Sequence, residues 1–501
     1  MSKKLFVRES SGLIKEVGLI DSIMLNMTNI SAGTALAASI SPYIIKGALL
    51  WLGAILGMLF TIPQAYVYMR LVRIGRTGSD YIWISRNLSA PIGVTVNIAW
   101  ILEAGAAFAL FAYFFSSTVA SVVNTIGTID GVPSLVSISN MISTPAWSYA
   151  IGAILFTVII IINIFKVRWG YRLITISSLL ATIITFIAIG VVAAHISDFS
   201  TAITPFLQKM DITPPPSYTS SIPPFSWVAT IKMLPLFGII AFVWINATAA
   251  VAGEIKKPKY AEWGVLVPLL LSGLIVALGF GVLYAAGGYY LTTYEFMNNG
   301  FVYTFWNIAI AVSTNYILQW IIGIGSFLWD FAVLAYGAVI FARYVFAVAF
   351  DRILPEIFTV VRNGSPIYIH IFDLALTLSL LVVPFVSISG ALALYGITVI
   401  GLIFFVFVGA SGIRVGFKGK DVKLILASIF TTAYFIFLTY EAVTNPVFSF
   451  ALPNGAPNPI TLGYVIGAFI TGAVIYYAAK IIRLRKDGID IDLIFKEIPP
   501  E

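Results

Sequence analysis

The chain has 501 residues, of which 59% are hydrophobic and only 10% are charged, and its mean hydropathy is +0.98. Soluble domains carry about 25% charged residues, so this chain lacks the polar groups to cover a water-facing surface and is predicted to be an integral membrane protein. The net charge of +7 could suggest a nucleic-acid partner, but in a membrane chain the placement of the charges matters more, and we expect no nucleic acid. The absence of Cys excludes a disulfide framework and a Cys-ligated metal, two His residues are too few for a His-rich metal site, and we expect no cofactor.

Twelve apolar stretches are long enough to cross a membrane, which requires about 20 mostly apolar residues in a helix. They lie at about residues 19–45, 47–69, 91–125, 148–166, 171–195, 226–254, 263–289, 313–342, 366–386, 390–412, 423–442 and 461–481. The sequence therefore predicts an all-α membrane protein with about twelve transmembrane helices, forming a single domain over residues 1–501.

Two of these spans are interrupted by polar residues. The first carries five polar side chains and a glycine in the stretch NMTNISAGT, residues 26–34, and the sixth carries WINAT, residues 244–248. Two interrupted helices in corresponding positions are typical of transporters built from inverted repeats, whose site lies at the unwound midpoints. The pattern predicts one five-helix repeat at 19–195, a second, inverted repeat at 226–412, and two additional helices at 423–481. For any single position the alternative is a polar residue that only holds packed helices together.

Two acidic residues lie deepest in the predicted membrane region, Glu103 in the third span and Asp330 in the eighth. They occupy corresponding members of the two repeats. A carboxyl group is costly to ionise in an apolar environment and can exchange a proton near neutral pH, so both are candidate coupling residues. A protonated or hydrogen-bonded structural acid is the alternative for each.

The basic residues are distributed unevenly across the predicted membrane. Of the 29 Lys and Arg residues, only Lys46, Lys209 and Lys232 fall on one side of the layout, and the others fall on the side that holds both termini. Lys and Arg resist translocation, so the basic side is expected to be cytoplasmic. We therefore expect a multi-pass protein of the cell membrane with both termini in the cytoplasm.

Three segments carry a resemblance to a known family. They are AFVWIN at 241–246 followed by EIKKPK at 254–259, ARYVFA at 342–347 followed by FDRILP at 350–355, and the entry to the first span, VGLID, at 17–21. In ungapped register these segments resemble the amino acid–polyamine–organocation (APC) superfamily of permeases. The resemblance implies a LeuT-like core of two inverted five-helix repeats plus two C-terminal helices. The chain departs from the family pattern in both interrupted spans. Ala32-Gly33-Thr34 stands where the family usually has Gly-x-Gly, and Trp244 and Asn246 stand where it usually has Gly and Glu.

The two interruptions predict a substrate site. The N–H groups of Ala32, Gly33 and Thr34 would bind a substrate carboxylate at a helix N-terminus, and carbonyls near residues 241–243 would bind its ammonium group. The full predicted set of substrate-binding residues is Asn29, Ser31, Ala32, Gly33, Thr34, Phe242, Trp244 and Asn246. Because no acid or base is certain in that pocket, we expect a substrate with an uncharged side chain.

These features favour a secondary active transporter that moves neutral amino acids by alternating access, with the lipid bilayer and a small-molecule substrate as its partners. Proton coupling through Glu103 or Asp330 is expected, and Na⁺ bound by Ser326 and the carbonyls of the first span is the alternative coupling ion. A transporter of polyamines or other organic cations or metabolites on the same fold is the alternative function. An intramembrane enzyme or a channel is disfavoured, because the sequence has no paired-Asp or nucleotide-binding motif and no repeated selectivity filter.

Overall fold

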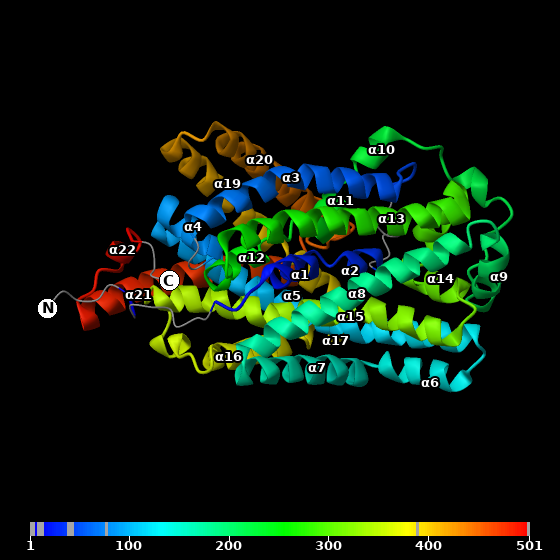
Figure 1. Ribbon diagram of the computed structural model, residues 1–501, viewed down its shortest axis with the longest axis horizontal. Helices are drawn as coiled ribbons and strands as arrows, with labels where there is room; N and C mark the ends of the chain where they lie inside the picture. The colour runs from blue at the N-terminus through cyan, green and yellow to red at the C-terminus, as the bar shows by residue number, and fades with distance from the viewer. Residues whose placement is uncertain (1–5, 8–14, 38–44, 76–78, 387–389, 498–501) are drawn as a thin grey trace.

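The computed structural model describes residues 6–7, 15–37, 45–75, 79–386 and 390–497. Within these ranges the chain is helical and contains no β-strand, only three isolated bridges. Figure 1 shows an elongated bundle in which the long helices run roughly parallel to one another. The prediction of an all-α membrane fold is confirmed.

Eleven helices or helix groups in the described ranges are long and apolar enough to cross a membrane. Eight are single helices: α3 (Leu50–Ile74), α5 (Ala90–Ile129), α7 (Pro145–Phe165), α8 (Val167–Ala194), α13 (Pro258–Asn299), α15 (Tyr316–Phe350), α20 (Val422–Thr444) and α21 (Pro459–Asp487). Three are composed of shorter pieces: α10 (Trp227–Ile231) to α12 (Ala247–Ala250); α16 (Ile367–Leu380) with α17 (Val383–Val386); and α18 (Gly390–Gly396) with α19 (Val399–Gly419). These eleven correspond to the second to twelfth predicted spans.

The first predicted span is broken, as expected from its sequence. It consists of α1 (Leu19–Ile30) and α2 (Ala32–Ala37), separated by Ser31, whose φ of 49° and ψ of 61° place it in the left-handed region. A non-glycine residue in this conformation is uncommon and ends the regular helix. Residues 38–44 of the predicted span lie outside the described residues.

The sixth predicted span is broken as well. It passes from α11 (Leu234–Phe237) through a π-helical turn at Gly238–Phe242 and then through four non-helical residues before α12 begins at Ala247. Single π-helical turns occur frequently at functional sites. Both interruptions therefore fall where the polar residues of the sequence predicted them.

Two spans are much longer than a bilayer requires. The 35 residues of α15 form a helix of about 53 Å, against a hydrocarbon core of about 30 Å. Helix α13 has 42 residues and contains a kink at Gly288, whose φ of +71° is readily adopted only by glycine. The chain beyond this kink continues through the second half of α13 into α14 (Phe305–Val312), which packs against α5, α8 and α15.

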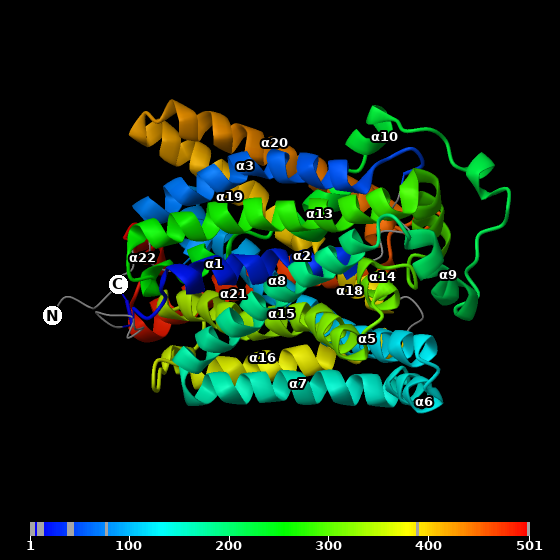
Figure 2. The ribbon, with the colours of Figure 1, turned by 45° about the vertical axis from the view of Figure 1, so that its right-hand side comes forward.

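The burial of the helices distinguishes the centre of the bundle from its surface. The most apolar stretch of α15 is 94% buried, whereas that of α21 is 28% buried. In Figures 1 and 2, α7 and α16 lie along one flank of the bundle and α19 and α20 along the other. These outer helices expose large apolar side chains such as Ile154 and Leu426. An apolar exterior of this kind is suited to lipid, and the chain is a multi-pass membrane protein.

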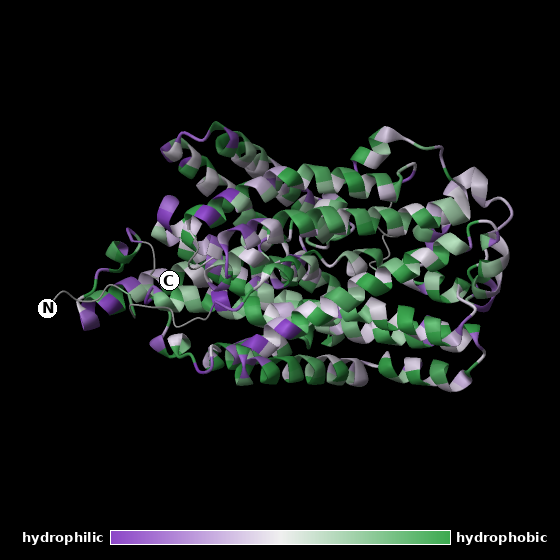
Figure 3. Ribbon diagram, viewed as in Figure 1, coloured by the Kyte–Doolittle hydropathy of each residue, from purple (hydrophilic) through white to green (hydrophobic). Residues whose placement is uncertain are grey.

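The two ends of the bundle differ. Both termini lie at one end, together with α4 (Ser79–Asn87) and α22 (Ile491–Ile494), and we call this the termini end. Figure 3 shows hydrophilic segments gathered there. The opposite end, which we call the far end, holds α6 (Pro133–Ile142), α9 (Phe199–Lys209), α10 and α14.

A short backbone pairing joins the two broken spans at the termini end. Val17, just before α1, forms a parallel bridge with Ile255, just after α12. The Val17 N–H donates to the Glu254 carbonyl at 3.1 Å, and the Lys256 N–H donates to the Val17 carbonyl at 3.0 Å.

Candidate functional site

A cavity of about 610 Å³ lies beside the two helix breaks. It is bounded by the first broken span, by α5 and α15, and by residues of α18. The lining residues that the sequence analysis singled out are Asn29, Ser31, Thr34, Glu103, Trp244, Ser326 and Asp330. The cavity extends toward the far end, where Phe301, Thr304 and Val447 belong to its wall. The substrate site predicted at the breaks therefore has a matching hollow.

Asp330 connects three helices at the wall of this cavity. Its Oδ1 accepts a hydrogen bond from the Thr34 hydroxyl at 2.8 Å, and its Oδ2 accepts one from the Thr118 hydroxyl of α5 at 2.9 Å. Thr34 in turn lies 2.7 Å from the hydroxyl of Ser31, the residue at the break. A change in the charge of Asp330 would therefore act directly on the interrupted first span.

Glu103 lies in the same cavity with different surroundings. It is 3% exposed, and among the described residues none forms a hydrogen bond or an ion pair with its carboxyl group. The described lining contains these two carboxyl groups and no Lys, Arg or His. A buried carboxyl without a counter-ion is costly to ionise, so the cavity favours either proton uptake or a cationic guest.

An aromatic stack forms the wall next to the second break. Trp244 stacks on Trp100 with ring centroids 6.1 Å apart, and Trp100 stacks on Phe404 at 5.0 Å. The Trp244 indole N–H also donates to the Ile239 carbonyl at 2.8 Å. Trp244 thus satisfies a backbone acceptor that the π-helical turn leaves available, which explains how a large residue can occupy a broken helix.

Asparagine side chains hold the two breaks together. Asn29 Nδ2 donates to Asn246 Oδ1 at 3.0 Å. Asn26 reaches the other broken span, where its Oδ1 accepts from the Ala247 N–H at 2.9 Å and its Nδ2 donates to Thr248 at 3.2 Å. These contacts satisfy polar groups that the interrupted helices would otherwise leave unpaired in the membrane.

Four of the residues predicted to bind substrate lie behind the cavity wall. Phe242 stacks on Phe237 at 6.3 Å, and the Asn246 amide is fully buried. Ala32 is also buried. Gly33 packs against Trp329, because a Cβ added at Gly33 would lie 1.9 Å from the Trp329 ring. None of these four belongs to the described lining.

Three residues that the sequence analysis did not single out also belong to the site: Trp100, Thr118 and Tyr344. Helical spacing offered a signal for two of them. Tyr344 follows Asp330 by 14 residues and Thr118 follows Glu103 by 15, each of which is about four helical turns and returns the chain to nearly the same face. No such signal identifies Trp100, whose importance comes from its contacts with other helices.

Comparisons with known proteins agree with this architecture. A family model described as an amino acid permease matches residues 17–475. A search of curated proteins finds no match. Among solved structures, the fold is similar to that of a Na⁺-coupled sialic acid symporter in a substrate-bound outward-open state, with a TM-score of 0.50 and 12% sequence identity over 87% of this chain and 91% of that one. At this identity the likeness supports the LeuT-like fold alone.

Proposed function

Since the chain belongs to the amino acid permease family, we propose that it is a secondary active transporter that moves amino acids with uncharged side chains across the cell membrane by alternating access. The observation that carries the proposal is the cavity beside two broken helices. Such a cavity offers free backbone groups to a zwitterion at the centre of the membrane.

In this proposal the two breaks bind the two ends of the substrate. The N-terminus of α2 would bind the carboxylate: Thr34 belongs to the cavity lining, whereas Ala32 and Gly33 lie behind it and would contribute their backbone N–H groups alone. The carbonyls of the π-helical turn accept from the ammonium group. The Val243 carbonyl already accepts a hydrogen bond from Gln64 at 2.9 Å, so we favour those of Ala241 and Phe242, which directly follow the lining residues Ile239 and Ile240 but do not themselves belong to the lining.

The substrate proposal is tested by uptake into proteoliposomes of three related compounds: a neutral amino acid, its amide and the amine left by decarboxylation. We expect the amino acid to be transported and the other two to compete at least about tenfold more weakly, because each lacks the carboxylate. Equal competition by the amine would reject the two-ended binding mode.

An organic cation is the second candidate substrate, and one observation favours it. The cavity combines two carboxyl groups with a stack of aromatic faces, and its described lining has no basic residue. Carboxylates and aromatic faces both attract ammonium groups. Transport of the decarboxylated amine in the experiment above, without transport of the amino acid, would favour this candidate.

We further propose that transport is coupled to protons through Glu103, Asp330 or both. Uptake should be driven by an imposed pH gradient, and at least one of the variants Glu103→Gln and Asp330→Asn should weaken or abolish that response. Asp373→Asn is a matched control, because Asp373 is a fully buried carboxyl on α16 that does not belong to the described cavity lining. A response to a Na⁺ gradient instead would favour the Na⁺ alternative, and normal pH dependence in both variants would reject the assignment.

A further inference from the structure

A continuous chain of hydrogen bonds leads from the central cavity to helix α4 at the termini end. Asn29 donates to Asn246, and Asn246 Nδ2 donates to the Tyr344 hydroxyl at 2.8 Å. Tyr344 in turn donates to Oδ1 of Asp80 at 2.8 Å. The second oxygen of Asp80 accepts from the Tyr68 hydroxyl at 2.8 Å. The cavity is therefore connected through three side chains, Asn29, Asn246 and Tyr344, to a single carboxyl group on α4.

Asp80 is the junction of three elements. Its own helix, α4, contributes the carboxyl, α3 contributes Tyr68 and α15 contributes Tyr344, and all three side chains are at most 1% exposed. Asn246 connects the same junction to the break in the sixth span. Tyr344 also lines the cavity, so its hydroxyl lies between the hollow and the buried carboxyl.

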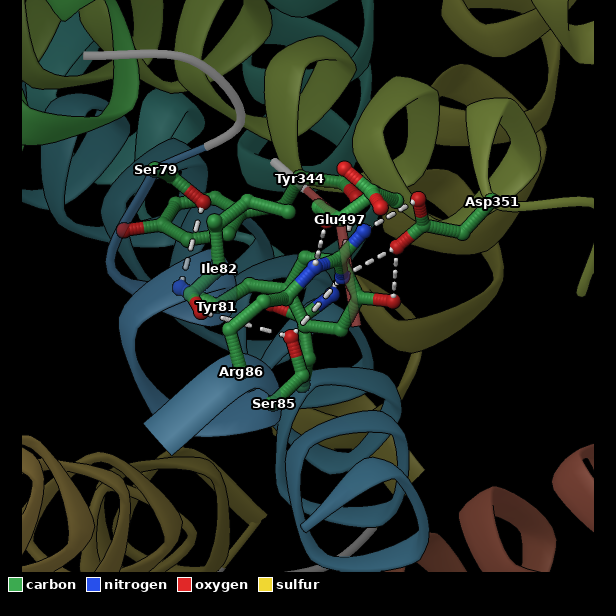
Figure 4. A network of polar contacts seen from close by, with 9 residues as sticks. Ser79, Tyr81, Ile82, Ser85, Arg86, Tyr344, Asp351 and Glu497 are labelled. Atoms are coloured by element: carbon green, nitrogen blue, oxygen red, sulfur yellow. Dashed lines mark hydrogen bonds and ion pairs between the residues drawn. The ribbon is translucent and has the colours of Figure 1, made fainter. Parts of the chain in front are cut away.

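A second attachment of α4 to α15 provides a comparison. Figure 4 shows Arg86 and Tyr81 of α4 gathered around Asp351 at the end of α15. Arg86 binds the Asp351 carboxylate through both terminal nitrogens, at 2.6 and 2.8 Å, and the Tyr81 hydroxyl donates to it at 2.7 Å. The Asp351 charge is thus balanced by a guanidinium, which remains charged at any physiological pH.

Asp80 has no such balance. Its carboxyl accepts hydrogen bonds from the Tyr68 and Tyr344 hydroxyls and from the backbone N–H groups of Asp80 and Tyr81, all of them neutral donors, and no ion pair to it is found in the described ranges. The other titratable group facing it is Tyr336 of α15. The basic residues Arg414 and Lys418 of α19 bind the opposite end of α4, at Leu88 and Asn87. A carboxyl that is stabilised by neutral donors alone can be neutralised by a proton without leaving a buried cation behind.

We propose that Asp80 is a proton-binding latch, which holds the termini end of the cavity closed while its carboxylate is charged and releases it on taking up a proton. The proposal rests on alternating access as the transport mechanism. A charged carboxylate accepts from Tyr344 and Tyr68 at once. A protonated carboxyl donates from one oxygen and accepts at the other, so one of the two tyrosine hydroxyls loses its acceptor. When the proton is on Oδ1, that hydroxyl is Tyr344, which finds no replacement because Asn246 presents a donor to it and gives its own oxygen to Asn29.

The pKa of Asp80 lies within the pH range in which the protein can be tested. Burial raises the pKa of the Asp80 carboxyl to about 6, although the hydrogen bonds from Tyr68 and Tyr344 oppose the rise.

Because the sequence contains no Cys, a single introduced Cys can report access to the cavity. Ile340 of α15 lines the cavity and is a suitable position, and the exposed Lys486 at the termini end is a reference position.

The test measures labelling of Ile340→Cys by a membrane-impermeant maleimide added at the termini side of proteoliposomes. Its rate is divided by that of Lys486→Cys at each pH, which removes the intrinsic pH dependence of the thiol. Between about pH 7.5 and about pH 5, the protonated fraction of a carboxyl with this pKa rises from roughly 3% to 90%, so the ratio should rise by at least about tenfold. Adding Asp80→Asn should give a high ratio at every pH.

Two further variants make the test specific. Tyr68→Phe removes one donor to the charged carboxylate, so the midpoint of the labelling curve should move up by about one pH unit. Asp421→Asn, which alters a partly exposed carboxyl that pairs with Arg70 at the same end, should leave the curve unchanged. If Asp80→Asn does not yield folded protein, the shift of the labelling midpoint in Tyr68→Phe is sufficient to test the proposal.

Any one of three results would overturn the proposal. Labelling could remain pH-dependent in Asp80→Asn, the midpoint could stay unmoved in Tyr68→Phe, or labelling of the parent protein could be independent of pH. Because the labelling requires no substrate, a failure of amino acid uptake would count against the proposed function and leave this result intact.

Discussion

The indole of Trp244 is fixed in the cavity wall by two kinds of contact. Its N–H donates to the Ile239 carbonyl, and its ring packs against both Trp100 and Phe405, with centroids 6.1 and 5.7 Å away. Gly401 approaches the same ring so closely that an added Cβ would lie 2.9 Å from it. Trp244 is therefore held in one position in the cavity wall.

We predict that Trp244→Gly admits bulkier substrates. The substitution removes a large aromatic body from the cavity wall, so large neutral amino acids should gain in competition for uptake relative to small ones. Trp244→Phe keeps an aromatic ring and should change the preference far less. A size profile that is identical in the parent and in Trp244→Gly would contradict this role.

Gly33 illustrates what the sequence could and could not predict about single residues. The polar cluster at residues 26–34 correctly predicted the break in the first span, because polar side chains and glycine are unusual at the middle of a membrane helix. The sequence also suggested that a side chain at Gly33 would crowd a substrate carboxylate. In the structure the nearest obstacle is the Trp329 ring, which comes from a helix almost 300 residues further along the chain. Gly33→Val would therefore disturb packing, and substrate analogues test the carboxylate site more directly.

The short helical turn after α12 is tied to α15 by a buried ion pair. Arg343 Nε lies 2.7 Å from Glu254 Oε1 and Arg343 Nη2 lies 2.9 Å from Oε2, while Tyr171 of α8 donates to the same carboxylate at 2.9 Å. Arg343 and Glu254 are 3% and 2% exposed. The pair fixes the termini-end half of the second broken span against the most buried helix of the bundle.

We predict that Glu254→Gln lowers the free energy of unfolding by about 3–5 kcal/mol, because it leaves the Arg343 charge buried without a partner. The double variant Glu254→Gln with Arg343→Met should be more stable than Glu254→Gln alone. The comparison is made by thermal unfolding of the detergent-solubilised proteins. Asp421→Asn, which breaks a partly exposed pair with Arg70, should cost at most about 1 kcal/mol. A double variant that is less stable than both single variants would contradict the expectation.

Hydropathy was sufficient to predict the spanning helices, since eleven of the twelve predicted stretches contain a spanning helix or helix group in the structure. Helix α4 was not predicted. Its nine residues lie between two spans in a segment that the sequence presented as a basic connection, and its buried face is created by contacts with α5, α15 and α19. Contacts of this kind join residues far apart in the chain, such as Asp80 and Tyr344, and leave no periodic signal in the segment itself.

The bundle as a unit has one strongly basic end. Both termini lie at this end, as do Arg86 of α4, which donates to the Glu497 carbonyl, and Lys418, which donates to Asn87 of α4. An even number of spans with both termini together agrees with the uneven distribution of Lys and Arg in the sequence. The division of the chain into two inverted repeats, at 19–195 and 226–412, remains a prediction.

We predict that reporters fused to either terminus are found in the cytoplasm of intact cells. A reporter inserted at Gly455, in an exposed turn between α20 and α21, should be found outside the cell. Paired fusions of a periplasmic-type enzyme and a fluorescent protein distinguish the two locations. Opposite locations for the two termini would show that the number of spans is odd and would reject the layout.

The pairing of Val17 with Ile255 has a mechanical consequence. Each broken helix can act as a hinge, and two unconnected hinges would bend independently of each other. The two backbone hydrogen bonds join the segments that enter α1 and leave α12, so the half-helices at this end share one degree of freedom. We therefore expect these two half-helices to move together, so that an opening at one break is accompanied by an opening at the other.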